Sequence, residues 1–305
     1  MPTLFEQRTQ EKRQENKDSN AGRKKALFSC LFSCISIVTD KPISNMTKFS
    51  RIKSAYVLGL LLALRCVSQS FAAAPKREYY QLKVYHLKDN SQRDRLDTYL
   101  KDAYLPALHR AGVGKIGVFK LAEADSTVYL FIPFKSVDQF AGLNETLAKD
   151  KQYATAGTEY INAAFDKPYY KGIESVLMES FAGMPNMVTP KLDGTPAERI
   201  YELRLYEAAT EKLHEAKVAQ FNNGELDIFS RLGFNVVFCG QVKAGAKLPS
   251  LMYMTSFASK ADRDAHWKSF SADPAWKSLN ALPEYAHNYL RADIYLLHPM
   301  PYSDI

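Results

Sequence analysis

Two eight-residue stretches of the chain share one alternation of apolar and polar positions. The first reads Tyr-Tyr-Gln-Leu-Lys-Val-Tyr-His over residues 79–86, and the second reads Ile-Tyr-Glu-Leu-Arg-Leu-Tyr-Glu over residues 200–207. A period of two predicts a β-strand in each, because successive side chains of a strand point to opposite faces. The second strand then has two distinct faces, one with Tyr201, Leu203 and Leu205 and one with Glu202, Arg204 and Tyr206.

The similarity between the two stretches continues along the chain. At an offset of 121 residues, the predicted helix end at Gly112 aligns with the one at Gly233. Later the offset becomes 123, where Asp150 aligns with Asp273. Each half then reads strand-helix-strand-strand-helix-strand, which is the ferredoxin-like order. We therefore predict an α+β fold in which two tandem ferredoxin-like units cover each other and form a barrel from two sheets.

The predicted boundaries follow from composition. The first unit covers residues 77–182 and the second covers residues 197–300. Residues 183–196 contain three prolines and two glycines, a composition typical of a linker.

The net charge of +7 belongs to the start of the chain. Residues 1–72 contain 12 basic and 5 acidic residues, so 28 of each kind remain in the rest. Because residues 73–305 have no net charge, their composition argues against nucleic acid as a partner.

Residues 46–72 have the order of a secretory signal peptide: a basic start, an apolar run over residues 55–64, and small residues after it. We expect cleavage near Ala72, a periplasmic location and no stable membrane span after processing, because this run is too short to cross a bilayer. Residues 1–45 contain a second apolar run, and we expect an over-extended start or a disordered leader there. A short membrane-associated segment is the alternative.

Side-chain types limit the chemistry. Cys239 is the only cysteine after the leader, and the six histidines lack the spacing of a metal site. We therefore expect no metal and no cofactor.

Several motifs of the second half resemble a known family: the strand over residues 201–206, the helix end Arg231-Leu232-Gly233, and the stretch with Arg263, Trp267 and Asp273-Pro274-Ala275-Trp276. Together they resemble the NIPSNAP domain of the dimeric α/β barrel superfamily, well over residues 197–300 and more weakly over residues 77–182. The resemblance implies a secreted bacterial member with no agreed reaction. Relatives in the superfamily include cofactor-free oxygenases, haem enzymes and binding proteins, so catalysis stays open.

Glu202, Arg204 and Tyr206 are the strongest candidates for a ligand site. If their face points into the barrel, a carboxylate, a guanidinium and a phenol meet in one cavity, where Arg204 can bind a carboxylate or enolate. The alternative is a structural ion pair between Glu202 and Arg204 at the seam between the halves.

Five further residues complete the candidate site. Lys83 and Tyr85 occupy the equivalent positions of the first strand, and Arg263, Trp267 and Trp276 lie on predicted helices of the second half. The two tryptophans can form a wall for a flat apolar ligand, or they can pack the core between helix and sheet.

These features predict a secreted NIPSNAP-type protein that binds a small apolar or carboxylated ligand inside the barrel. The first alternative is a cofactor-free oxygenase- or isomerase-like enzyme, in which Arg204 stabilises an enolate and Glu202 or Tyr206 moves a proton. The second is an interaction scaffold that forms homo-oligomers through exposed sheet edges.

Overall fold

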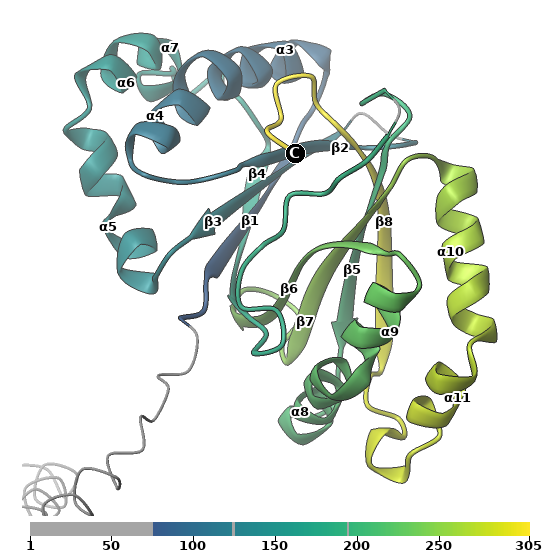
Figure 1. Cartoon of the computed structure of the whole chain (residues 1–305). Coiled ribbons are helices and arrows are strands. Elements are labelled where there is room, and N and C mark those ends of the chain that lie inside the picture. The colour runs from purple at the N-terminus through teal and green to yellow at the C-terminus, as the bar shows by residue number, and fades with distance from the viewer. Residues whose placement is uncertain (1–75, 124–125, 194) are drawn as a thin grey trace, which may run out of the picture. The chain divides into compact units, whose positions relative to one another are not determined.

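Eight antiparallel strands close into one barrel, with helices on its outside (Figure 1). The structure is a computed structural model that describes residues 76–123, 126–193 and 195–305. The leader and signal peptide predicted for residues 1–45 and 46–72 lie outside these residues. Within the described part of the chain, no helix has the length and apolar character needed to cross a membrane.

The first half follows the predicted order of elements. They are β1 (Tyr79–His86), α3 (Asn90–Tyr99), η1 (Leu100–Tyr104), α4 (Leu105–Arg110), β2 (Gly117–Leu121), β3 (Thr127–Phe134), α5 (Val137–Ala148), α6 (Lys151–Ala156), α7 (Thr158–Ile161) and β4 (Gly172–Ser180).

The second half repeats this order, with the short helix η3 in the place of α7. Its elements are β5 (Ile200–Glu207), α8 (Glu211–Gln220), η2 (Phe221–Glu225), α9 (Leu226–Arg231), β6 (Asn235–Ala244), β7 (Ser250–Phe257), α10 (Lys260–Ala272), α11 (Pro274–Asn280), η3 (Pro283–Tyr285) and β8 (Arg291–Pro299). In both halves the glycine that follows the first helical region, Gly112 or Gly233, adopts a positive φ of 78° or 77°, as predicted.

A π-helical segment interrupts the first helical region of each half at the same place. The segments η1 and η2 are π-helical and lie 121 residues apart, which is the offset between the two strands. Such segments are rare and occur often at functional sites. Each ends on a buried residue, Tyr104 in the first half and Glu225 in the second.

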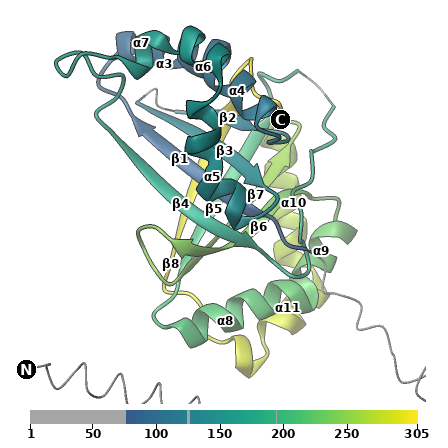
Figure 2. The ribbon, with the colours of Figure 1, turned by 90° about the vertical axis from the view of Figure 1, so that its left-hand side faces the viewer.

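The strands pair around the barrel in the order β1-β3-β2-β8-β5-β7-β6-β4. Two seams join the halves, β2 with β8 and β4 with β6 (Figure 2). Every described strand therefore has two neighbours, and the exposed sheet edges that the scaffold alternative requires are absent from the described barrel. The boundaries at residues 77–182, 183–196 and 197–300 stay a prediction, because the halves share one closed sheet.

Apolar side chains from all eight strands fill the barrel interior. Leu203 and Leu205 of β5 belong to this interior cluster, and Phe131 of β3 stacks on Phe238 of β6 with ring centroids 4.4 Å apart. The prediction that the polar face of β5 points into the barrel is therefore wrong, and the interior is a packed core instead of the predicted ligand cavity.

The helices cover the outer face of the sheet in two separate layers (Figure 1). Helices α3 to α7 pack on the first half and α8 to α11 on the second, each around its own apolar cluster. Strands β3 and β7 are buried along their whole length because the interior covers one face and helices cover the other. Polar side chains on the outer face thus lie between sheet and helices.

Candidate functional site

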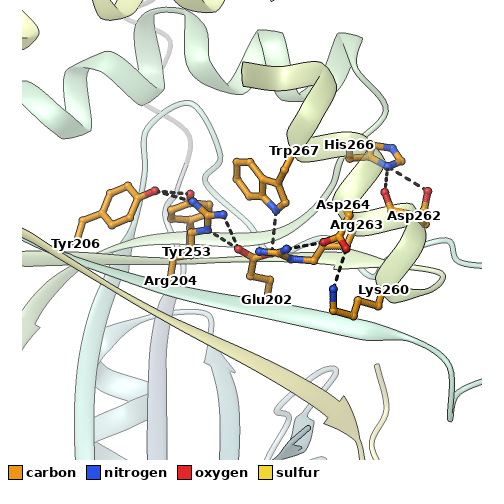
Figure 3. Close-up of polar contacts among 10 residues, drawn as sticks. All are labelled: Glu202, Arg204, Tyr206, Tyr253, Lys260, Asp262, Arg263, Asp264, His266 and Trp267. Carbon is orange, nitrogen blue, oxygen red and sulfur yellow. Dashed lines mark hydrogen bonds and ion pairs between the residues drawn. The ribbon is translucent and has the colours of Figure 1, made fainter. Parts of the chain in front are cut away.

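Glu202 is the hub of a buried polar network beneath α10 in the second half (Figure 3). Its side chain is fully buried, and Oε1 accepts hydrogen bonds from Nε of Arg204 at 2.6 Å. Its other oxygen, Oε2, accepts from Nε of Arg263 and, at 2.8 Å, from the indole nitrogen of Trp267. Both carboxylate oxygens are therefore engaged by cations or a strong donor.

Arg204 and Tyr206 are held equally firmly. The guanidinium of Arg204 lies 3.6 Å above the ring of Trp267 and donates to the hydroxyl of Tyr206 at 3.2 Å. That hydroxyl lies 2.9 Å from the hydroxyl of Tyr253 on β7. Hydrogen bonding and stacking thus fix each group of the predicted trio in one arrangement.

A second buried ion pair lies beside this network. Nζ of Lys217 on α8 lies 2.8 Å from a carboxylate oxygen of Glu225, and the two residues are only 3% and 2% exposed. Burial raises the pKa of the Glu225 carboxyl, and the ammonium of Lys217 acts in the opposite direction. The positive charge of Lys217 and the negative charge of Glu225 therefore compensate each other beneath the helices.

The second-half contacts favour a structural role for these predicted site residues. Each buried cation has a carboxylate, as the ion-pair alternative expected, although β5 lies between β7 and β8 and away from the seams. Trp267 and Trp276 are half-buried and pack against the apolar cluster of this half. The structure brings Glu202, Arg204, Tyr206, Arg263 and Trp267 together in a network that already satisfies its charges.

The equivalent position in the first half carries a cation without an anion. Lys83 lies on the outer face of β1, mostly buried, and its Nζ is 3.0 Å from the hydroxyl of Tyr104 on η1. No carboxylate among the described residues forms an ion pair or hydrogen bond with Lys83. Burial lowers the pKa of Lys83 to about 8, and the nearby Tyr170 acts in the opposite direction.

Tyrosine side chains from several elements cluster on the side of β1 that carries Lys83. The Tyr99 and Tyr153 hydroxyls lie 2.8 Å apart, and the Tyr99 ring stacks on Tyr104 with centroids 5.6 Å apart. Burial, followed by four neighbouring phenols, raises the pKa of Tyr85 well above its ordinary value. We call this group the tyrosine cluster, and it consists of Tyr85, Tyr99, Tyr104, Tyr153, Tyr160 and Tyr170.

Burial favours the uncharged phenol in five members of the tyrosine cluster, which are Tyr85, Tyr99, Tyr104, Tyr153 and Tyr160. Burial raises the pKa of Tyr104 to about 12, and it also raises the pKa of Tyr153 and Tyr160. The cluster therefore offers uncharged hydroxyl donors around a single titratable amine.

On the side of β4, the residues next to Lys83 are exposed. Its register partner on that strand, Ser175, is exposed, and so is the neighbouring Ile173. A separate cleft of about 620 Å³ opens on the helix side, where Tyr99 and Tyr160 contribute to its lining. The lining of this cleft also includes the carboxylates of Asp94, Asp102 and Glu159. These negative charges repel anions, so an anion would enter more readily beside β4.

Among the described residues, no three His, Cys, Asp or Glu side chains are grouped closely enough to hold a metal ion.

Comparison with known proteins assigns the second half. The family model for NIPSNAP matches residues 201–304. The second half of this chain is a NIPSNAP domain. No curated protein matches the sequence.

Solved structures show the same fold over most of the chain. A protein from Lactobacillus acidophilus, provisionally named a monooxygenase, is 12% identical, and the match covers 73% of this chain and 94% of that one with a TM-score of 0.52. A protein from Fusobacterium nucleatum with the same provisional name is 8% identical, covers 74% and 93%, and has a TM-score of 0.52. At these identities the likeness concerns the fold alone, a dimeric α/β barrel.

A third structure matches a smaller part of the chain. It is a NIPSNAP family protein of unknown function from Agrobacterium tumefaciens, 22% identical, and the match covers 35% of this chain and 93% of that one with a TM-score of 0.32.

The charge-matched network therefore belongs to the NIPSNAP domain, and the unmatched lysine lies in the other half. Lys83 and Tyr85 were predicted from their alignment with Arg204 and Tyr206, but the other tyrosines were not. They come from helices and a loop that only folding brings to β1. The available signal was the concentration of tyrosines at residues 99, 104, 153, 160, 169 and 170.

Proposed function

We propose that this NIPSNAP-domain protein binds a small organic anion in its first half, with Lys83 as the charged contact and the tyrosine cluster as the wall. The observation that carries the proposal is a mostly buried ammonium group with no carboxylate partner among the described residues. In the second half, the same chain supplies carboxylates to Arg204 and Lys217.

The physical reason is the cost of an unpaired buried charge. Removing an ammonium from water is expensive unless an opposite charge or several hydrogen bonds replace the solvent. At Lys83 the described protein supplies one hydroxyl contact, from Tyr104. A ligand anion would supply the missing charge, so part of its binding energy comes from neutralising Lys83.

The surroundings indicate the rest of the ligand. Phenol rings offer flat apolar faces together with hydroxyl donors, which suits a carboxylate attached to an aromatic or apolar body. This retains the ligand class predicted from the sequence and moves the site from the barrel interior to the space between β1 and its helices.

Calorimetric titration with phenylacetate tests the proposal. We expect Lys83→Met to weaken binding at least about tenfold, because a charge-assisted contact is lost. The affinity of the wild type should fall by about tenfold per pH unit above about pH 8, because the anion requires the protonated amine.

Lys115→Met is the matched control, since Lys115 is an exposed loop residue of the same half. It should bind phenylacetate as the wild type does. Equal affinities for the wild type and Lys83→Met would show that Lys83 is not the anion contact.

The enzyme alternative built on Arg204 has less support. Both oxygens of Glu202 and the guanidinium of Arg204 are already occupied by protein groups. A proton-transfer role for Glu202 would require this network to break first.

Export to the periplasm is the second part of the proposal, and the pattern of residues 46–72 supports it. Expression of the full chain followed by fractionation and amino-terminal sequencing tests it. We expect a mature chain that begins just after Ala72, and recovery of an unprocessed cytoplasmic chain would contradict export.

A further inference from the structure

The group around Lys83 combines a basic amine with several hydroxyl donors. Nζ of Lys83 lies 3.0 Å from the Tyr104 hydroxyl, and Tyr170 lies close enough to influence its charge. A base and oxyanion donors at one position are the parts required for removing a proton next to a carbonyl group. The second half has no such combination, because its cations are neutralised by Glu202 and Glu225.

We propose that Lys83 is a general base that takes a proton from the carbon beside a ligand carbonyl, while the Tyr104 hydroxyl holds the enolate oxygen that results. The step rests on the proposed function, because the same site must bind the ligand. The C–H bond breaks, the proton moves to Nζ of Lys83, and the electron pair remains on the ligand as the enolate. Return of the proton restores the amine, so no oxidant or further reactant is required.

The surroundings of Lys83 permit this transfer. The groups that face it are Gln81 and Tyr85 from β1, Tyr104 from η1, Tyr170 before β4 and Ser175 on β4. Gln81 and Ser175 carry no ionisable group, and burial raises the pKa of Tyr85 and Tyr104. A neutral amine and a neutral ketone can therefore meet without burying a charge in advance, and the ion pair forms only with the transfer.

The amine also titrates in a useful range. With a pKa near 8, a substantial fraction of Lys83 is neutral in mildly alkaline solution, and its conjugate acid is strong enough to return the proton. Carboxylate binding and proton removal should then show opposite pH dependences. Binding of phenylacetate falls as pH rises through about 8, and proton removal increases over the same range.

Hydrogen–deuterium exchange of phenylacetone in D₂O tests the activity with the full chain. Phenylacetone is uncharged, so its binding does not depend on the ammonium. NMR follows loss of the α-proton signals, and we expect a protein-dependent rate that rises with pH and levels off above about pH 8.

Lys83→Arg separates the two roles of the residue. Arginine keeps a positive charge but cannot accept a proton in this pH range, so phenylacetate affinity should stay within about tenfold. The exchange rate should fall at least about 100-fold, in line with the loss of a general base. Tyr104→Phe should slow exchange at least about tenfold through loss of an oxyanion donor. Lys115→Met should exchange as the wild type does.

The outcomes distinguish this inference from the proposed function. Phenylacetate binding that depends on Lys83, without protein-dependent exchange, would overturn the base assignment and leave the binding site in place. Exchange that persists in Lys83→Arg would also overturn it, because another group would then be the base. Absence of both activities would contradict the binding proposal as well.

Discussion

The two halves of the barrel share a frame and differ in how they treat buried charge. In the NIPSNAP domain, Glu202 and Glu225 neutralise the cations beneath the helices. In the first half, Gln81 stands where Glu202 stands, Tyr104 stands where Glu225 stands, and Lys83 has no carboxylate partner among the described residues. The comparison separates a half whose buried charges are paired from a half in which we propose that one buried charge binds a ligand.

One helix-capping contact is the same in both halves. Asp150 caps α6 and pairs with Arg110, and Asp273 caps α11 and pairs with Arg231. The residues beneath the helices therefore differ while the surface contacts that orient those helices are retained. Four predictions test this contrast, from the largest effect to the smallest.

Glu202→Gln should have the largest effect on stability. It leaves the guanidinium groups of Arg204 and Arg263, only 14% and 19% exposed, without their buried counter-charge. Breaking a buried pair in this way typically lowers the free energy of unfolding by about 3–5 kcal/mol. Urea denaturation measures it, with the exposed Glu145→Gln on α5 as the control, for which we expect a change within about 0.5 kcal/mol.

Lys83→Met should change stability in the opposite direction. It removes an ammonium whose burial is uncompensated, so the free energy of unfolding at pH 7 should increase by about 1–3 kcal/mol. The lowered pKa means that the unfolded chain binds more protons than the folded one between about pH 8 and 10.5, so wild-type stability rises with pH in that window. The increase in the free energy of unfolding that Lys83→Met gives at pH 7 should therefore become smaller as the pH rises through this window.

Denaturation of both proteins at pH 7 and pH 10 measures this difference. If Lys83→Met destabilised the protein as Glu202→Gln does, Lys83 would be a structural residue and the contrast between the halves would fail.

Gln81→Glu should give the cation of the first half a carboxylate partner, as Arg204 has in the second half. The new carboxylate would stand two residues from Lys83, as Glu202 stands two residues from Arg204, while Ser175 could still bond to it. We expect phenylacetate affinity to fall at least about tenfold, because the internal carboxylate competes with the ligand. Gln139→Glu, on α5 and outside the cluster, is the charge-matched control. Unchanged affinity in Gln81→Glu would argue against neutralisation as the source of binding.

Arg110→Ala and Arg231→Ala should have the smallest effects, and similar ones. Both arginines are exposed and pair with an aspartate that its helix N-terminus already stabilises. We expect each to lower Tm by no more than about 3 °C. A large loss in only one of the two would show that the frame is not shared as closely as the contacts suggest.

Local sequence signals predicted much of the fold. Period-two alternation identified β1 and β5, and the positive-φ glycines at 112 and 233 marked the helix ends. These predictions succeeded because they depend on backbone sterics and on contacts only a few residues apart. The family resemblance, carried by motifs of the second half, also agreed with the match to NIPSNAP over residues 201–304.

The candidate site was harder to predict because both faces of β5 are buried. Alternation divides a strand into two faces, but it does not say which face lines the barrel when helices cover the other. The polar face was placed inside, and the structure has Leu203 and Leu205 there. Polar residues were still correctly grouped, since Glu202, Arg204 and Tyr206 do contact one another.

The sequence alone determined the strands, the repeated order of elements and the positions of Lys83 and Arg204 on equivalent strands. Those features follow from local geometry and from alignment of the two halves. Tertiary structure decided which strand face meets the helices and which distant side chains join it there. Tyr104 and Tyr170 reach Lys83, and Arg263 and Trp267 reach Glu202, only because segments from separate parts of each half pack on one sheet. Arg263 obtains its carboxylate partner through such a long-range contact, because charge neutralisation acts through space and not along the chain.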